Sequence, residues 1–537
     1  MAEKGNGNDR GDLLAGLDER QRAAALAVDG PVRIIAVAGA GKTRTITRRI
    51  AHACASGAWD PRRTLAVTFS VKAANEMRRR IAQLGVTGVR AATFHSAALG
   101  QLRAVWPLLS DAWFPQLVTD GRGLVARVAT RMGGRLAGIE ASGVRDVLEE
   151  INWTKVSLIA PDDYPRVCAA THRLPPMGLS PARFAEVIDA YEGEKASRGV
   201  IDFNDILLLT CHVLDEGGDA AKRIRSTVGW LTVDEYQDVS PLQHRLMRLW
   251  MGQGRDVCVV GDPAQTIYSF AGATQWYLRD FDRDFGPVSA DLRLDTDYRS
   301  TPQIVRAANH VLAKAPRDCG YLPLLPARAE GPVVGVRAHA TDADEAADVA
   351  SRIARLVASG VRPADIAVLG RLRAQASPVC AALAKVGVPF SVRTAAQEGV
   401  ASAVGPSEAA IDANARQMEE TEDEASPADG SPVARASRQD ERRLLEQGLP
   451  GHVTVSTIHA AKGLEWRHVF VIGACEGLIP YGSPDSGPEL EEERRLMYVA
   501  ITRGEDSVQI SYAAGKDGAS RMPRQPSRFL AGFPRRR

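Results

Sequence analysis

Apolar and polar stretches alternate along this chain in a pattern that predicts strands followed by helices. Residues 32–37 form a short apolar run with β-branched residues, a glycine-rich turn follows, and a helical pattern begins at Lys42. A second apolar run, residues 230–233, ends in two acidic residues. Later runs that we expect to be strands lie at residues 333–336, 366–369 and 389–392. Strand, turn and helix in succession predict an α/β fold built on parallel sheets.

Length and composition limit the class of protein. The chain has 537 residues, too many for one hydrophobic core, so we expect several domains. Its 45% hydrophobic and 25% charged residues are typical of a soluble globular protein, and no apolar run approaches the ~20 residues of a membrane span. Residues 1–12 lack the apolar stretch of a secretory signal. We therefore expect a cytoplasmic protein.

Charge and cysteine content narrow the chemistry further. The formal net charge is only +2, so any binding of nucleic acid must use a local groove rather than a basic surface overall. The seven cysteines are scattered singly, without the paired spacing of a zinc site or a disulfide framework.

The turn after the first strand has the spacing of a phosphate-binding loop. It reads Ala38-Gly39-Ala40-Gly41-Lys42-Thr43, between a strand and a helix as such a loop requires. Backbone N–H groups around Gly39 and Gly41 would surround the phosphates of ATP, Lys42 would reach the β- and γ-oxygens, and the Thr43 hydroxyl would bind Mg²⁺. The alternative is a plain glycine-rich turn, but that turn rarely coincides with a downstream strand that ends in acids.

The acidic pair after the second strand supplies the other half of the expected ATP site. A carboxylate just past a strand end is where a second magnesium contact belongs, which assigns Asp234 to the metal. Glu235 then becomes the candidate general base for the attacking water. Adjacent acids also occur as helix caps or on solvated surfaces, but the following Tyr236-Gln237-Asp238 favours the catalytic interpretation.

These motifs, and others in the same order, resemble those of the superfamily 1A DNA helicases of the UvrD, PcrA and Rep type. Residues 151–155 and 202–207 are most similar to an actinobacterial group often called the second UvrD. The matched segments run from residue 17 to residue 503 and comprise residues 17–21, 38–43, 68–74, 93–96, 233–238, 260–270, 297–301, 457–466 and 492–503.

The resemblance implies roles for residues around the nucleotide. Gln265 would sense the γ-phosphate, and Arg299 and Arg503 would reach it as two arginine fingers, each worth ~10³ to 10⁵ in rate. Arginines that reach one ATP from a second domain would close the gap between domains, as a motor needs. The residues implied to hold the rest of the nucleotide are Gln21, Arg44, Tyr298 and Glu465.

The resemblance also implies contacts to single-stranded DNA. Stacking on Phe69, Tyr268 and Phe270 would hold any sequence, because every base has a π-face and stacking is worth ~1 to 3 kcal/mol per base. Each aromatic taken alone is better explained as core, and its position inside a matched motif reverses that expectation. The other implied DNA contacts are Thr93, His95, Thr457 and His459.

The family's organisation then predicts the domains. Residues 1–105 and 200–280 are expected to form a first RecA-like motor domain, and residues 106–199 an inserted helical accessory domain. A second RecA-like domain would comprise residues 281–394 and 451–537. Residues 395–450 are acidic and rich in Ser, Pro, Ala and Gly, which is typical of a disordered linker, whereas the family has a second accessory domain there.

The sequence therefore predicts an ATP- and Mg²⁺-dependent DNA helicase that translocates 3′ to 5′ in repair or at replication forks. Its partners would be single-stranded DNA, tailed duplex DNA and a possible protein that supplies duplex contacts. One alternative is a translocase that strips proteins without separating strands, which the expected lack of the second accessory domain favours. Another is a nucleotide-switched subunit of a larger complex, such as a defence complex.

Overall fold

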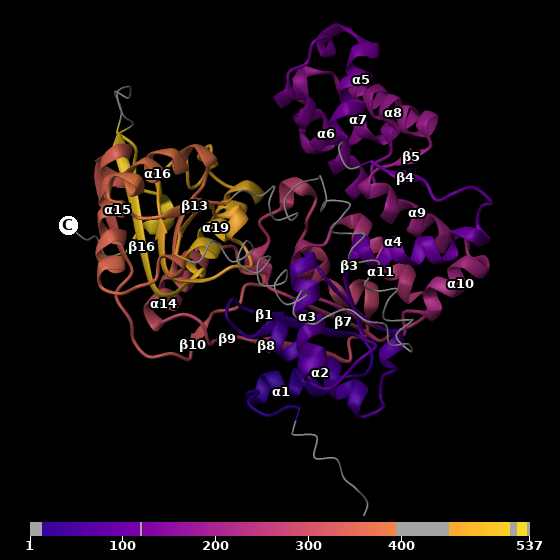
Figure 1. Cartoon of the computed structure of the whole chain (residues 1–537), viewed down its shortest axis with the longest axis horizontal. Helices are drawn as coiled ribbons and strands as arrows, with labels where there is room; N and C mark the ends of the chain where they lie inside the picture. Colours follow the sequence, from indigo (N-terminus) through magenta and orange to yellow (C-terminus); the bar gives the residue numbers. More distant parts are fainter. Residues whose placement is uncertain (1–12, 119–120, 394–450, 516–522, 534–537) are drawn as a thin grey trace, which may run out of the picture.

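The computed structural model describes residues 13–118, 121–393, 451–515 and 523–533, which fold around two parallel six-stranded sheets and a separate helical unit (Figure 1). The α/β class predicted from the sequence, with two parallel-sheet domains, is confirmed. The acidic segment 395–450 lies outside the described residues.

The first sheet is built from buried apolar strands covered by helices on both faces. Its order is β3 (Arg90–Thr93), β2 (Thr64–Thr68), β6 (Trp230–Val233), β7 (Val257–Gly261), β1 (Val32–Ala36) and β8 (Ala290–Leu294). β2 and β7 are buried at every residue, as central strands of a doubly covered sheet require. The covering helices are α1 (Glu19–Leu26), α2 (Lys42–Ala55), α3 (Val71–Gln83), α4 (Phe94–Val105), α9 (Phe203–Glu216), α10 (Gly218–Ser226), α11 (Pro241–Met251), α12 (Trp276–Arg279) and α13 (Phe281–Phe285).

The edge strand β8 corrects one predicted boundary. It pairs in parallel with β1, with Ala290 opposite Val32 and Leu294 opposite Ala36. The chain therefore leaves the first sheet only after Leu294, later than the predicted start of the second domain at residue 281. Local sequence does not indicate this strand clearly, because β8 alternates polar and apolar residues as an edge strand does.

The second sheet repeats the parallel architecture. Its order is β11 (Gly335–Thr341), β16 (Gly504–Gly515), β15 (Trp466–Val471), β12 (Ile366–Gly370), β14 (Val453–Thr457) and β13 (Phe390–Val392). β13 and β14 are hydrogen-bonded neighbours although residues 394–450 separate them in the chain. Packed with this sheet are α14 (Pro302–Leu312), α15 (Asp342–Ala358), α16 (Ala376–Lys385) and α19 (Pro488–Ile501), and a short pair, β9 (Thr296–Asp297) with β10 (Leu325–Pro326), precedes it.

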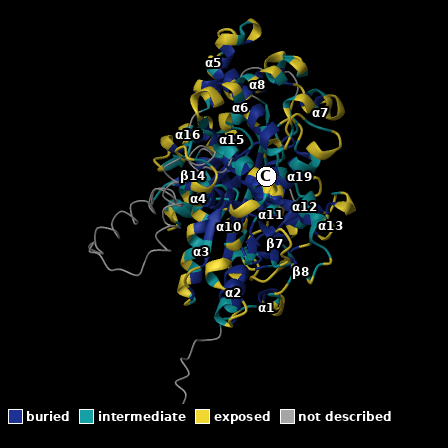
Figure 2. Cartoon of the chain, turned by 90° about the vertical axis from the view of Figure 1, so that its right-hand side faces the viewer, coloured by how far each residue is buried: buried dark blue, intermediate teal, exposed yellow. Residues whose placement is uncertain are grey.

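The helical unit has a hydrophobic core of its own. It consists of α5 (Arg122–Met132), α6 (Ala141–Val156), α7 (Tyr164–Thr171) and α8 (Pro181–Arg198), and the paired strands β4 (Gln116–Leu117) and β5 (Val200–Ile201) connect it to the first domain. Tyr164, Phe184 and Tyr191 are fully buried at its centre. Its outward faces carry exposed residues, as the side view shows (Figure 2). None of the described helices is long and apolar enough to span a membrane.

A buried cluster of charges joins this helical unit to the first domain. Lys155 of α6 lies 2.5 Å from Asp202 and 2.8 Å from Asp205, at the start of α9. Lys195 of α8 binds the same two carboxylates at 2.9 and 2.5 Å, and Glu192 lies 2.8 Å from both lysines. Two cations among three carboxylates are nearly balanced, and the pairing offsets the high cost of removing each charge from water.

We predict that Lys155→Met lowers the stability of the first domain and the helical unit. Removing one partner leaves buried carboxylates undercompensated, which costs about 3 kcal/mol. The measurement is the midpoint of urea unfolding. Lys222→Met is the matched control, because Lys222 also pairs with an aspartate but its side chain is 78% exposed. Equal midpoints for the two variants would contradict this role of the cluster.

Candidate active site

The loop after β1 has the backbone shape of a phosphate-binding loop. Gly39 and Gly41 both have φ of 73°, in the left-handed region that favours glycine, and Gly41 is the residue that caps α2. A Cβ atom on Gly39 would collide with the carboxylate of Asp297. The loop therefore leads directly into the N-terminus of α2, whose first N–H groups are free to bind an anion.

Lys42, Thr43 and Asp234 lie together at this loop. Lys42 Nζ donates to the carbonyl oxygens of Ala36 and Val37, at 3.2 and 3.5 Å. The Thr43 hydroxyl is hydrogen-bonded to the Asp234 carboxylate, and burial together with the charge of Glu235 raises the pKa of Asp234 to about 7. The two residues predicted to bind Mg²⁺ are thus in contact, and they offer hard oxygen ligands that suit it.

Glu235 stands in a strained position beside them. Its φ of 54° is left-handed, which is uncommon for a residue other than glycine and is typical of functional sites. Burial acts to raise the pKa of its carboxyl, but the positive charges of Lys42 and Lys462 outweigh it and hold the pKa below the usual value. Glu235 is therefore ionised, the state in which a carboxylate can accept a proton from water.

Arg503 and Arg299 enter the same region from the turn between α19 and β16 and from the segment after β9. Arg503 is buried and donates to Val499 O and Leu464 O, each at 3.1 Å, and to Gln265 Oε1 at 3.5 Å. Those acceptors are neutral, and burial together with the nearby charge of Arg299 lowers the pKa of Arg503 to about 10. Arg503 remains charged at neutral pH and can bind a further anion.

Arg299 is paired with Glu465, which the family resemblance implies would help hold the nucleotide. Its guanidinium forms an ion pair with Glu465 and lies 3.5 Å from the carbonyl oxygen of Thr502. Gln265 donates to Asp262 at 2.8 Å. The structure thus gathers the five residues predicted to be catalytic, Lys42, Glu235, Gln265, Arg299 and Arg503, around one interface between the two domains.

The residues predicted to read the base and sugar lie on the outer side of the loop. Gln21 Nε2 donates to Ala40 O at 3.0 Å, and Arg44 donates to Gly16 O at 2.8 Å. The Tyr298 hydroxyl bonds to Asp18, and its side chain is partly exposed. These contacts place a polar amide and an accessible aromatic ring next to the phosphate-binding loop, which is the set that an adenine needs.

Two residues that make contacts across the interface were missed by sequence reasoning. The Tyr498 hydroxyl of α19 donates to Asp262 at 3.1 Å and accepts from the N–H of Ala38 at 3.3 Å. Lys462 Nζ donates to Asp238 at 2.7 Å. Lys462 and Tyr498 stand inside motifs already matched, but their partners are more than 200 residues away, and no spacing in the sequence indicates them.

An aromatic cluster extends from this interface toward the predicted DNA side. Phe69 and Tyr268 stack with ring centroids 6.1 Å apart and planes at 3°. Phe270 meets both Tyr268 and His459 edge-on, and the Tyr268 hydroxyl donates to His459 O at 3.0 Å. Phe270 is 55% exposed, whereas Tyr268 is buried. Phe270 is therefore the ring most open to a base, and Tyr268 connects the two domains.

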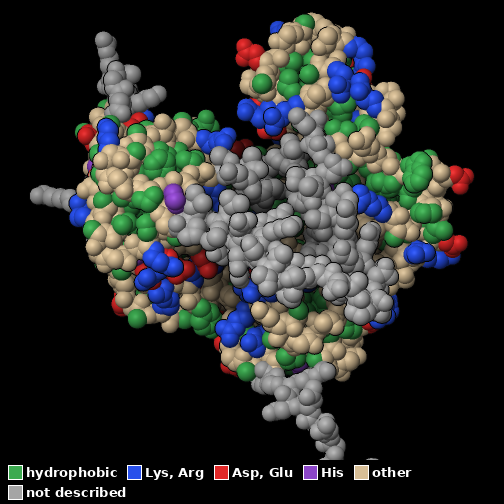
Figure 3. Space-filling model, in the orientation of Figure 1, with side chains coloured by type: hydrophobic (Ala, Val, Ile, Leu, Met, Phe, Trp, Pro, Cys, Tyr) green, Lys and Arg blue, Asp and Glu red, His purple; other side chains and the backbone are tan. Residues whose placement is uncertain are grey.

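Three other predicted DNA contacts have internal partners. Thr93 caps α4 by accepting from Ser96 N at 3.1 Å, and Thr457 accepts from Ala460 N at 3.3 Å. The His95 ring packs on Phe203 at 4.2 Å, and burial lowers its pKa to about 3. Their contact with DNA stays a prediction. On the face shown in Figure 3, lysines and arginines form separate patches among acidic ones rather than a continuous basic surface.

Comparison with family models gives matches to both halves of the chain. Residues 17–286 match the UvrD/REP helicase N-terminal domain. Residues 292–397 and 417–515 match the UvrD-like helicase C-terminal domain.

Of three individual proteins that align with the chain, two do so over nearly its whole length and one over part of it. The chain is 39% identical to the ATP-dependent DNA helicase UvrD2 of Mycobacterium tuberculosis, over 97% of this chain and 82% of that protein. It is 26% identical to the ATP-dependent DNA helicase PcrA of Bacillus subtilis, over 97% of this chain and 86% of the relative. UvrD1 of M. tuberculosis is 32% identical over 71% of this chain and 50% of its own length.

We predict that Lys462→Met lowers DNA-stimulated ATP hydrolysis by roughly tenfold or more, because loss of a hydrogen bond between charged groups costs ~1.5 to 3 kcal/mol. Lys462 bridges the domains next to Glu235 and Gln265. The measurement is steady-state ATPase with saturating single-stranded DNA. Lys385→Met, on an exposed position of α16, is the control. Equal rates in the two variants would show that the bridge is dispensable.

Proposed function

The chain belongs to the UvrD/Rep helicase family and is an ATP-dependent DNA helicase of the UvrD and PcrA type, and we propose that it moves 3′ to 5′ along one strand and separates the duplex ahead. The observation that best supports a motor is the position of Arg503. It belongs to the second domain, yet its guanidinium contacts Gln265 of the first. Repair and replication-fork processing are the processes in which we expect this activity.

The proposed hydrolysis uses groups already in place. Glu235 is ionised by its basic neighbours and would accept the proton of the attacking water. Lys42 and the N-terminus of α2 would bind the β- and γ-phosphates, and Arg299 and Arg503 would stabilise the charge that spreads over the γ-phosphate. Thr43 and Asp234 fit a magnesium ion, which when bound would neutralise part of the phosphate charge.

The proposed coupling to DNA follows from the same interface. Arg503, Lys462 and Tyr498 all connect the second domain to the first, and Tyr268 connects the aromatic cluster to His459 across it. A γ-phosphate that binds both domains favours the closed arrangement over the open one, and hydrolysis removes that preference. Each cycle would therefore shift His459 against Phe69 and Tyr268, and a strand stacked there would move with it.

We predict that Lys42→Ala and Glu235→Gln each abolish ATP turnover, by ~10³-fold or more, because the first loses a phosphate contact and the second the general base. The measurement is steady-state ATPase with DNA present. Glu216→Gln is the control, because Glu216 lies on the exposed end of α9, where it pairs with His212. Substantial turnover in either site variant would overturn the assignment of the ATP site.

We predict that a duplex with a 3′ single-stranded tail is unwound and that a duplex with a 5′ tail is not. The measurement is single-turnover strand separation with ATP and Mg²⁺ on the two matched substrates. Unwinding of the 5′-tailed substrate alone would reverse the proposed direction. No separation of either, with DNA-stimulated ATPase intact, would favour a translocase that does not separate strands by itself.

A further inference from the structure

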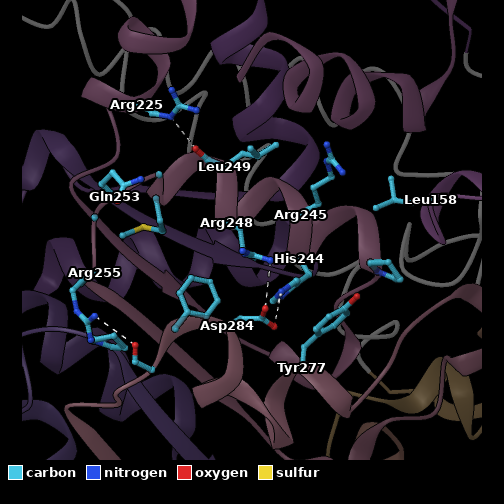
Figure 4. Close-up of a pocket in the computed structure, with 17 residues that line it drawn as sticks. Leu158, Arg225, His244, Arg245, Arg248, Leu249, Gln253, Arg255, Tyr277 and Asp284 are labelled. Atoms are coloured by element: carbon cyan, nitrogen blue, oxygen red, sulfur yellow. Dashed lines mark hydrogen bonds and ion pairs between the residues drawn. The ribbon is translucent and has the colours of Figure 1, made fainter. Parts of the chain in front are cut away.

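A pocket of about 680 Å³ opens on the flank of the first domain, between α11, α13 and the loop before β7 (Figure 4). α10, α11 and α13 appear on the same side of the molecule in the side view (Figure 2). None of the residues predicted for ATP or for DNA lines it. Four arginines, Arg225, Arg245, Arg248 and Arg255, contribute to its walls, together with a single aspartate, Asp284.

Two of the four arginines are held by main-chain oxygens. Arg225 donates to Leu249 O at 3.0 Å and to Leu214 O at 2.7 Å. Arg255 donates to Pro287 O at 2.8 Å. Carbonyl oxygens fix the position of a guanidinium but do not cancel its charge. Both groups are therefore oriented in advance and keep their attraction for an anion.

The other two arginines lie on the exposed rim of α11. Arg245 pairs with Asp215 at 2.5 Å and Arg248 with Asp284 at 3.4 Å, and their side chains are 51% and 56% exposed. The Arg245–Asp215 pair is exposed on both sides, and such pairs are worth ~0 to 1 kcal/mol, so an incoming anion can replace Asp215 at little cost. Asp284 is only 18% exposed, but it keeps His244 as a neighbour when an anion binds Arg248. Guanidinium groups bind phosphate with two parallel hydrogen bonds, which makes phosphate the anion that this set fits best.

The wall of the pocket is connected to the general base. Asp284 lies 3.3 Å from His244 Nε2, and His244 Nδ1 is hydrogen-bonded to the Tyr236 hydroxyl at 2.8 Å. The His244 ring also stacks on Tyr277 at 3.8 Å, which fixes its plane. Tyr236 is fully buried and follows Glu235 directly in the chain. A change at Asp284 thus has a short path of contacts to the strained backbone of Glu235.

We propose that this pocket is a second phosphate-binding site, separate from the ATP site, whose occupancy reaches Glu235 through Asp284, His244 and Tyr236. A phosphate that binds Arg248 would displace Asp284 from it, and Asp284 would then bind His244 more closely. The open, arginine-lined rim suits the backbone of a DNA strand that extends past the aromatic cluster, and in that form the inference rests on the proposed function. A free polyphosphate has the same chemistry and is the other possible source.

The test of binding is hydrogen exchange of residues 241–255 in the full-length protein. The probes are a short oligonucleotide that covers only the aromatic cluster, a strand several times longer, and inorganic tripolyphosphate. The variant is R245Q/R248Q. The matched control is R306Q/R362Q, which removes two exposed, ion-paired arginines of the second domain.

We expect the long strand, and not the short one, to protect residues 241–255, and R245Q/R248Q alone to abolish this protection. The same variant should reduce the salt dependence of long-strand binding by about 0.7 in log–log slope for each lost phosphate contact. Protection by tripolyphosphate that also depends on Arg245 and Arg248 would support the site with a free phosphate as its ligand. If neither the long strand nor tripolyphosphate protects residues 241–255, while both strands protect the segment around Phe69, the inference is overturned and the proposed function stays intact. Failure of both strands to protect Phe69 would instead count against the proposed function.

The connection to Glu235 is tested with Tyr236→Phe, which removes only the hydroxyl that contacts His244. We expect this variant to keep the protection of residues 241–255 but to lose any extra stimulation of kcat by the long strand over the short one. His244 itself is unchanged in this variant, so its stacking on Tyr277 is retained. Extra stimulation that survives in Tyr236→Phe, or that is absent from the unchanged protein, would overturn the connection.

Discussion

The structure depends above all on balancing buried charges where its two motor domains meet. Asp234, Glu235 and Asp238 of the first domain are removed from water at this interface, and Lys42 of the same domain supplies only part of the compensation. Lys462 and Arg503 of the second domain supply more. Because an uncompensated buried charge is costly, the ionisation of these carboxylates depends on how the two domains are arranged. A change in the arrangement of the two domains must therefore change the ionisation of Asp234, Glu235 and Asp238.

The same constraint explains why the interface includes groups that are not catalytic. Tyr498 satisfies Asp262 and the N–H of Ala38 at once, so it fixes α19 against the phosphate-binding loop. Lys462 lies 4.9 Å from the ring of Tyr268 while it pairs with Asp238. One ammonium group therefore contacts both the acidic side of the ATP site and the aromatic cluster. A change in stacking at Tyr268 would therefore shift Lys462, whose positive charge lowers the pKa of Glu235.

The fold class and much of the candidate ATP site could be predicted because they depend on local sequence. A strand, two glycines and Lys42 are close in the chain, and their chemistry requires that spacing. The edge strand β8 could not be found in this way, since two of its five residues are exposed and only one is buried. Contacts such as Lys462 with Asp238 depend on tertiary packing, and no local pattern specifies them. Similarly, residues 151–155 and 202–207 stood out in the sequence, but only the fold shows that Lys155 and Asp202 from these segments are paired.

The pairing of β13 with β14 has a consequence for how such a chain can change in evolution or by engineering. The two strands are adjacent in the second sheet, although residues 394–450 come between them in the chain. The cost of closing a loop grows only slowly with its length, by about 0.6 kcal/mol for each doubling. The register of the sheet is set by the strands themselves, so the sheet can accept modules of very different size at this point. A foreign domain whose termini lie close together could be grafted there without redesigning the motor beneath it.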